Sequence, residues 1–444
     1  MRHSINYEIM SCHQHWGVKW AQSVCSERCT PDRFFFQIDR FFLPEKKHAR
    51  NDGMNWIHFV FLSALLCGSM LSRANTIVNS AEELKNALGS GISADGIIEL
   101  GADLTFSNDI PFPLGMLSQN NCTPFTGVLH GNGYSIRCQG MPSGNTNTYN
   151  GLFCGLENAT IDNLFIDSSC SLTGQYVGAL CATVTGSITL SNVTNMANIN
   201  GEMKAGGFIG QVLRVKEPFS ISLNQCRNGG QVTAGDGTGG FIGRIANSDN
   251  MEIAFSECTN NETISGSSYV GGFIGDFSIN KNVTLSFVNS TNSGDVSIKG
   301  DLGDLKDLGG FIGSFTQITN ASVKVFGSIN TGTISGRSNI GGFFGNIYNT
   351  DNMELIISDV TNNGTISGES YSGGFAGYIQ PNANTHFASL VLTNGANKGL
   401  ISASAGIACG LFCIFESSDP KINTTVFNSI NKGTIKANKK KAME

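Results

Sequence analysis

Few residues beyond position 74 have the type and spacing that catalysis requires. Histidine occurs there only at His130 and His386, and neither lies in the H-E-x-x-H pattern that places two imidazoles around zinc. A serine–histidine–acid triad would need one of these two. His130 lies in the phrase LHGNGYSI, which we interpret as strand, turn and strand with the histidine as a turn residue. Cys409 and Cys413 lie in an apolar run, where we interpret both as buried.

The strongest acidic candidate is the set Asp301, Asp304 and Asp307 in the inserted segment KGDLGDLKD (299–307). Its spacing could gather oxygens around Ca²⁺, but we favour a solvated, protruding loop. Polysaccharide lyases and hydrolases cluster carboxylates on one face, whereas no carboxylate recurs here at an aligned position. We therefore predict no catalytic residue, no metal site and no cofactor. A groove with two acidic side chains and an arginine would favour an enzyme, and faces of Asn, Ser and Thr would favour binding.

A recurring phrase must position any site that exists. GGFIG, or the variants GGFFG and GGFAG, begins at Gly206, Gly239, Gly271, Gly309, Gly341 and Gly373. Neighbouring phrases are mostly 32 or 33 residues apart, and one step is longer because 299–307 is inserted. A fixed period of this length is typical of solenoids, in which each unit contacts only its neighbours.

Each unit contains three extended pieces: N-x-G-x-[IV]-x-G, the GGFIG phrase, and an alternating apolar run such as MELIISDVTN (353–362). Period-two alternation indicates strands with one buried face. We predict an all-β fold, a right-handed parallel β-helix with three short strands per coil and about 32 residues per repeat. NSAEELKNALGSG (79–91) is predicted to form a short N-terminal capping helix with a capping box from Ser80 to Glu83.

Aligned positions predict ladders of like side chains. We expect buried stacks of Phe208, Phe241, Phe273, Phe311, Phe343 and Phe375, and of Val232, Ile264, Val296, Ile334, Ile366, Ile401 and Ile435. We expect a corner ladder, with amides bonding along the stack and left-handed backbone tolerated, of Asn228, Asn260, Asn292, Asn330, Asn362, Asn397 and Asn431. The paired glycines should let the backbone approach the next coil closely.

The first 74 residues differ from the rest. Residues 54–74, from MNWIHFVFLSALLCGSMLSRA, have the layout of a secretory signal peptide. We interpret 1–53 as a non-native, disordered upstream extension, with translation starting at Met54. The alternative keeps Met1 and makes 56–72 a signal anchor. Both interpretations place 75–444, the predicted β-helix, outside the cytosol, and a C-terminal truncation stays open because the last repeat breaks off.

Nine N-x-[ST] sequons follow residue 74, which suits a secreted glycoprotein. The candidate glycosylation sites are Asn121, Asn158, Asn192, Asn261, Asn282, Asn289, Asn320, Asn363 and Asn423. Cys226 and Cys258 occupy equivalent places in neighbouring repeats, and stacked strands lie within disulfide range. The pair is a candidate disulfide, and two buried thiols are the alternative. The net charge of −6 gives no reason to expect nucleic acid as a partner.

The phrases PFTGVLHGNGYSIRC (124–138), NGLFCGLENATIDNLFI (150–166) and YVGAL (176–180), followed by the GGFIG units, resemble the GLUG-repeat proteins. The resemblance covers roughly 75–437 and implies a secreted or surface β-helix of the pectin-lyase-like, adhesin-like kind. We expect a binding or structural rod without catalysis whose partner is an extracellular glycan or protein. Its only membrane attachment would be an N-terminal signal anchor. The alternative is a carbohydrate-active lyase or hydrolase on the same fold.

Overall fold

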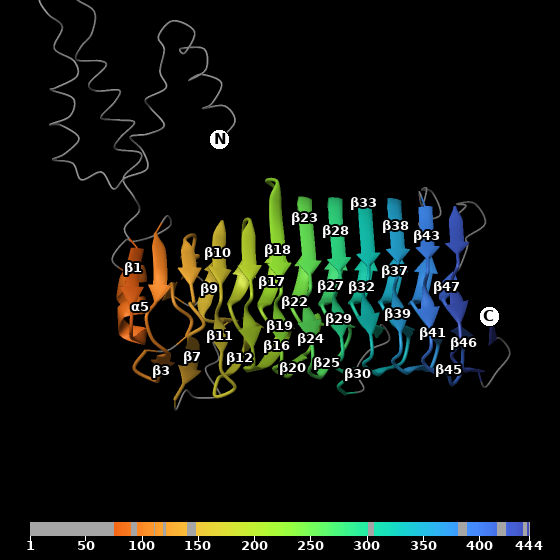
Figure 1. Ribbon diagram of the computed structural model, residues 1–444, viewed down its shortest axis with the longest axis horizontal. Coiled ribbons are helices and arrows are strands. Elements are labelled where there is room, and N and C mark those ends of the chain that lie inside the picture. Colours follow the sequence, from red (N-terminus) through yellow and green to blue (C-terminus); the bar gives the residue numbers. More distant parts are fainter. Residues whose placement is uncertain are drawn as a thin grey trace, which may run out of the picture. The chain divides into compact units, whose positions relative to one another are not determined.

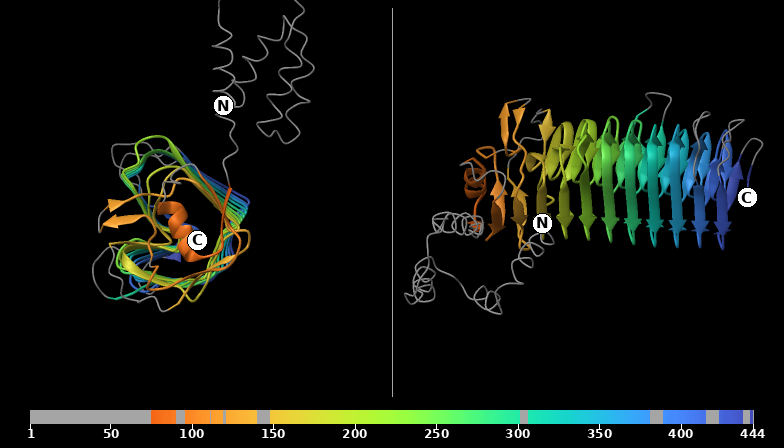
Figure 2. Two further views of the ribbon diagram at one scale, coloured as in Figure 1. Left: turned by 90° about the vertical axis from the view of Figure 1, so that its left-hand side faces the viewer. Right: turned by 90° about the horizontal axis from the view of Figure 1, so that it is seen from above.

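The computed structural model describes residues 75–89, 96–110, 112–118, 121–139, 148–300, 306–380, 389–414, 423–437 and 442–443. These residues belong to one compact unit, Ser72–Glu444, and the predictions for 1–53 and 54–74 concern residues outside the described part of the chain. Parallel strands from successive repeats stack side by side into long sheets (Figure 1). Viewed from the end, the coils superimpose (Figure 2). The prediction of an all-β parallel solenoid is confirmed, and its right-handed sense stays a prediction.

From Phe219 onward each complete described coil has five short strands rather than the three predicted, and the two coils before it (159–184 and 188–213) have four. One coil contains β23 (Asp249–Ser256), β24 (Thr259–Asn260), β25 (Ile264–Gly266), β26 (Val270–Gly271) and β27 (Ile274–Ser278). The N-x-G-x-[IV]-x-G piece supplies two of these strands, and the GGFIG phrase lies across the boundary between two others. Glycine and asparagine turn the chain at these places, so the pieces that looked continuous in sequence are bent in space.

The stack keeps its register over its whole length. One sheet has 12 strands, from β1 (Asn75–Val78) to β48 (Thr424–Phe427), and two others have 11 and 9. Neighbouring coils pair equivalent residues, as in Met251 with Val283 and Ile264 with Val296. The described residues contain almost no helix.

Phenylalanine fills the interior between two sheets. The predicted stack from Phe208 to Phe375 is buried, and the ring centroids of Phe273 and Phe311 lie 4.6 Å apart, nearly parallel. A second stack, formed by Phe255 and Phe287, packs its edges against the first, with centroids of Phe273 and Phe287 5.5 Å apart. Offset stacks and edge contacts are the favourable aromatic geometries. The buried stack of phenylalanines is therefore confirmed.

The asparagine ladder is present and begins one coil earlier than predicted, at Asn195. In each rung the side-chain Nδ2 donates to the Oδ1 of the next coil, as from Asn260 to Asn292 at 2.8 Å, and to a backbone carbonyl two residues on. The left-handed geometry predicted for these residues is wrong. It belongs to other residues, including Asn250 and Asn352 at the second positions of their strands and Asn289 between two strands.

Helix α5 (Ala81–Gly89) follows β1. The hydroxyl of Ser80 accepts from the backbone N–H of Glu83 at 3.2 Å, and the Glu83 carboxylate accepts from the backbone N–H of Asn79. Its Leu84 and Ala87 side chains are buried. Whether this helix acts as a cap of the solenoid stays a prediction.

The cysteines pair differently from the candidate proposed in the sequence. Disulfides join Cys122 to Cys154, Cys138 to Cys170 and Cys409 to Cys413. The predicted Cys226–Cys258 bridge is not formed, although the two residues lie on neighbouring coils. Each thiol instead donates to backbone carbonyls, for Cys226 those of Leu190 and Asn224 and for Cys258 those of Leu223 and Ser256. The buried-thiol alternative therefore describes this pair.

The buried ladder predicts a large cost for losing one rung. Asn292→Ala removes a donor to Gly294, a donor to Asn330 and the acceptor of Asn260. We expect the free energy of unfolding in urea to fall by about 3 kcal/mol, because the remaining partners stay buried and unsatisfied. The matched control is Asn352→Gly, which removes an exposed amide that donates to Asn320 on the neighbouring coil. Glycine keeps the left-handed backbone of this position (φ 50°), so the variant should cost under about 1 kcal/mol. Equal losses in both variants would contradict this account.

The thiol assignment can be checked by alkylation and peptide mass mapping without reduction. We expect Cys226 and Cys258 to react only after the protein is unfolded, because both are buried in the folded chain. The peptides with Cys122 and Cys154 should be recovered as a linked pair. A linked Cys226–Cys258 peptide would overturn the assignment.

Candidate functional site

The GGF phrases are flanked by two positions whose residues change from coil to coil. One lies two residues before the first glycine, and the other lies five residues after it. We call these positions the polar stripe. Its members from the phrase at Gly206 onward are Lys204, Gln211, Arg244, Tyr269, Asp276, Asp307, Ser314, Asn339, Asn346, Tyr371 and Tyr378, and the one remaining position is Gly237.

Strand register aligns the stripe along the stack. Before the phrase, Asp307 in β31 (Asp307–Gly309) pairs with Asn339, and Asn339 pairs with Tyr371. After the phrase, Ser314 pairs with Asn346, and Asn346 pairs with Tyr378. The two rows are joined across the turn because Asn346 donates to Asp307. The stripe is therefore one continuous surface built from two sheets.

A pocket of about 540 Å³ opens over the part of the stripe that runs from Tyr269 to Tyr378. This volume lies within the range of small-ligand sites. It is lined by Tyr269, Asp307, Ser314, Thr316, Gln317, Ser338, Asn339, Asn346, Tyr348, Ser370, Tyr371 and Tyr378. Aromatic rings, amides and hydroxyls thus surround a single carboxylate.

Asp307 lies at the base of the pocket and is only 1% exposed. Its Oδ1 accepts from Asn339 Nδ2 at 2.7 Å, and its Oδ2 accepts from Asn346 Nδ2 at 2.9 Å. Burial raises the pKa of this carboxyl to about 6, against the opposing effect of the hydrogen bonds. The interpretation of Asp307 as part of a solvated loop is therefore wrong, because it begins a strand. Asp301 and Asp304 lie outside the described residues.

Tyrosines form the walls of the pocket. The rings of Tyr371 and Tyr378 are 5.3 Å apart between centroids and tilted by 49°, and the Tyr378 hydroxyl donates to Gln380. Tyr348, at the end of β37 (Phe344–Tyr348), is 45% exposed. Burial, followed by the charges of Asp307 and Asp276, raises the pKa of Tyr269 to about 12. The phenol of Tyr269 is therefore neutral at physiological pH and lies near the carboxyl groups of Asp307 and Asp276.

Ion pairs occupy the earlier part of the stripe. Arg244 and Asp276 are stacked on neighbouring coils, with Nε and Oδ2 2.9 Å apart. Burial raises the pKa of Asp276, and Arg244 opposes that shift. The buried Lys204 amine pairs with Asp236. These charges are neutralised by each other, which leaves the tyrosine-lined pocket as the candidate binding site.

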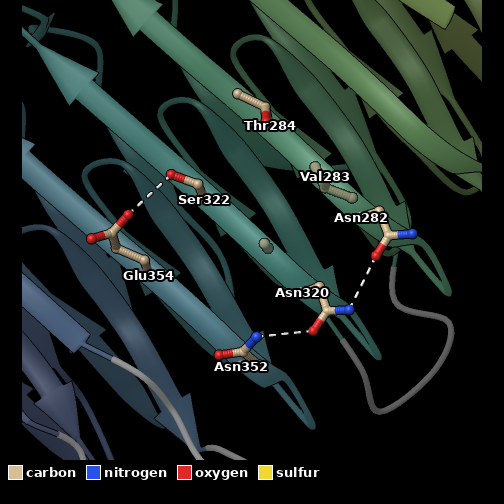
Figure 3. Close-up of a pocket in the computed structure, with 8 residues that line it drawn as sticks. Asn282, Val283, Thr284, Asn320, Ser322, Asn352 and Glu354 are labelled. Atoms are coloured by element: carbon tan, nitrogen blue, oxygen red, sulfur yellow. Dashed lines mark hydrogen bonds between the residues drawn. The ribbon is translucent and has the colours of Figure 1, made fainter. Parts of the chain in front are cut away.

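A second depression, of about 450 Å³, lies on the outer face of β28 (Lys281–Val288), β33 (Thr319–Phe326) and β38 (Asp351–Ser358). Figure 3 shows Asn282, Asn320 and Asn352 stacked along it. Asn320 donates to Asn282 at 3.0 Å and accepts from Asn352 at 2.9 Å. These amides satisfy each other on an open surface, so this depression is the weaker candidate site.

Most of the candidate glycosylation asparagines reach solvent. Side chains are exposed or half-buried at Asn158, Asn192, Asn261, Asn282, Asn289, Asn320, Asn363 and Asn423. Asn121 lies in β5 (Asn121–Cys122). Attachment of glycans at these positions stays a prediction.

The structure places the other residues considered for chemistry in separate surroundings. His130 ends β6 (Val128–His130), and its Nδ1 lies 2.7 Å from Asp162 Oδ2 on the next coil. No serine hydroxyl completes a triad with it in the described part of the chain. Cys409 and Cys413 form a disulfide, so neither is a free ligand. His386 lies outside the described residues.

Two kinds of feature are absent from the residues that the structure describes. These residues contain no group of three or more His, Cys, Asp or Glu side chains that could hold a metal ion. They also contain no helix with the length and apolar composition that a membrane span requires.

The sequence interpretation missed the tyrosine-lined pocket. It considered carboxylates that recur at aligned positions, whereas the stripe positions carry a different side chain in each coil. The usable signal was the fixed offset from the glycines, because the two flanking positions of the GGF phrases are polar or aromatic everywhere except at Gly237. That offset places them on the same surface in each coil.

Comparison with known proteins adds little to this description. No protein-family model matches the chain, and no curated protein matches it. Among solved structures, one from Bacteroides ovatus, described as a "putative immunoglobulin A1 protease", is similar with a TM-score of 0.42 and 16% identity. The match covers 56% of this chain and 76% of that one.

The buried carboxyl predicts a specific pH dependence of stability. The pKa of Asp307 is raised from 3.8 to about 6 in the folded protein, so its stabilising contribution is complete below about pH 4 and is lost as the pH rises through about 6. Asp307→Asn is neutral at every pH. The melting temperature of the wild type relative to this variant should therefore fall between about pH 4 and pH 6, by the equivalent of about 1–3 kcal/mol, and should change little above about pH 7.

The control for this measurement is Asp351→Asn, which changes a carboxylate at the start of β38 outside the pocket. The informative quantity is how the stability difference between wild type and Asp307→Asn changes with pH. The loss of one hydrogen-bond acceptor in Asp307→Asn shifts that difference by the same amount at every pH, so it does not affect the slope. A difference between wild type and Asp307→Asn that does not change with pH would contradict the burial argument.

Proposed function

We propose that the chain is a secreted or cell-surface β-helical repeat protein of the GLUG type that binds an extracellular ligand without catalysis. It would act as an adhesin-like rod that presents its binding pocket to a glycan or a protein. The observation that carries this proposal is the pocket over the polar stripe, where tyrosines and amides from successive coils converge. The solenoid supplies the spacing, and the stripe supplies the contact surface.

Cysteine pairing supports a location outside the cytosol. Two disulfides join residues 32 positions apart on neighbouring coils, and such bonds persist mainly in oxidising compartments. Sequon asparagines whose side chains are exposed or half-buried are compatible with a glycoprotein. The signal peptide, the right-handed coil and a capping role for α5 belong to the same proposal.

The pocket chemistry favours binding over catalysis. Glycosidases generally use two carboxyl groups around the scissile bond, whereas the described lining contains only Asp307. Both oxygens of that carboxyl already accept hydrogen bonds from Asn339 and Asn346. No arginine lies among the described lining residues. The remaining walls are amides, hydroxyls and phenols, which orient a ligand.

The second candidate function is a carbohydrate-active hydrolase on the same stripe. The observation in its favour is that the pKa of Asp307 is raised to about 6, as a general acid requires. Asp276 and Arg244 lie on the coils that precede it. In this alternative Asp307 would protonate a leaving oxygen and Asp276 would be the second carboxylate.

A screen of the purified full chain separates these functions. We expect binding to immobilised glycans or extracellular matrix proteins, and no release of reducing sugar or unsaturated product from polysaccharides. The binding proposal fails if the folded protein retains no ligand. Turnover that is lost in Asp307→Asn but kept in Asp351→Asn would establish the hydrolase instead.

A further inference from the structure

We propose that the tyrosine-lined pocket recognises a neutral glycan chain lying along the coil axis, rather than an acidic polysaccharide or a protein segment. This inference rests on the proposed binding function and specifies the ligand of the same pocket. It depends on three features of the lining: its aromatic faces, its polar groups and the absence of basic side chains among its described residues.

Aromatic faces are available in two successive coils. Tyr348, Tyr371 and Tyr378 all line the pocket, and Tyr371 and Tyr378 lie close enough to form one surface. Sugar rings carry apolar C–H faces, which pack against aromatic rings while their hydroxyls point sideways. This combination suits a carbohydrate better than a purely apolar ligand.

The polar groups between the tyrosines match sugar hydroxyls. Amides and hydroxyls both donate and accept, as a polyol requires, and the lining supplies them from Ser314, Thr316, Gln317, Ser338, Asn346 and Ser370. Asn346 uses its Nδ2 on Asp307, and its buried Oδ1 has no partner among the described residues. An unsatisfied buried acceptor is costly, so a hydroxyl entering beside Asn346 would gain a hydrogen bond there.

The charge of the pocket selects against acidic glycans. No lysine or arginine lies among the described lining residues, although uronate and sulfate recognition relies on such groups. Arg244 is paired with Asp276, and Asp307 together with Asp276 disfavours negative charge at Tyr269. An anionic chain would meet repulsion without a compensating cation.

The extent of the pocket indicates a short stretch of chain. Its lining comes from four successive coils, represented by Tyr269, Asp307, Asn339 and Tyr371. Three steps of about 4.8 Å give a length of roughly 14 Å along the axis. That length accommodates a short oligosaccharide rather than one sugar ring. On the N-terminal side of the pocket, the stripe is occupied by the ion pair of Arg244 and Asp276.

The test measures binding of the full chain to soluble oligosaccharides by calorimetry. The neutral probes are oligomers of glucose, mannose and N-acetylglucosamine, and the acidic probes are oligogalacturonate and heparin fragments. We expect at least one neutral probe to bind and the acidic probes to bind more weakly. Tyr371→Ala should weaken the affinity for the neutral probe by about tenfold. Tyr371→Phe should retain binding because it keeps the aromatic ring.

The matched control is Tyr176→Ala. Tyr176 occupies the same position relative to its glycine and stacks on Tyr149 at 5.4 Å between centroids, but it lies outside the pocket. Melting temperatures of all variants establish that each is folded. Stronger binding of acidic probes, binding of matrix proteins alone, or equal losses in Tyr176→Ala and Tyr371→Ala would each overturn this inference. The first two results would leave the proposed binding function intact, whereas absence of any ligand would remove both.

Discussion

The fold depends on a close contact between the second glycine of each GGF phrase and two features of the next coil. A Cβ built on Gly272 would lie 2.1 Å from the carbonyl oxygen of Gly310 and 2.4 Å from Oδ1 of Asn292. Real Cβ atoms cannot approach so closely, so only glycine fits. The contact ties the glycine phrase to the buried asparagine ladder, and each motif requires the other at a fixed distance along the chain.

This constraint explains why the insertion at 299–307 leaves the solenoid intact. The rung from Asn292 to Asn330 spans 38 residues instead of 32 but keeps its 2.8 Å hydrogen bond. Strand pairing resumes unchanged at Asp307 with Asn339. Additional chain is absorbed at a turn because the energy of the stack resides in the ladders, and lengthening a loop costs little. The insertion also ends at the residue that forms the base of the pocket.

Much of the fold was predictable because packing repeats in the sequence. Like residues at a constant period implied the phenylalanine stacks and the asparagine ladder, and both are found. The number of strands was underestimated because bends at glycine do not interrupt the apolar pattern. Left-handed backbone was assigned to the wrong asparagines, since residue type alone does not distinguish a buried rung such as Asn292 from a corner residue such as Asn289. Which cysteines form disulfides depends on the direction of their side chains, and the repeat period alone does not give that direction.

The candidate site was harder to predict because it lies at positions that the packing constraint leaves free. Glycine and phenylalanine must recur, whereas the flanking residues point away from the core stack and carry tyrosine, aspartate, asparagine or arginine in different coils. Because these flanking residues do not recur, looking for repeated residues does not find them. Asn346 and Asp307 are 39 residues apart, yet they meet because they flank equivalent phrases, at Gly341 and Gly309, on neighbouring coils. A solenoid can thus vary its recognition chemistry one coil at a time while the glycine contact holds the scaffold constant.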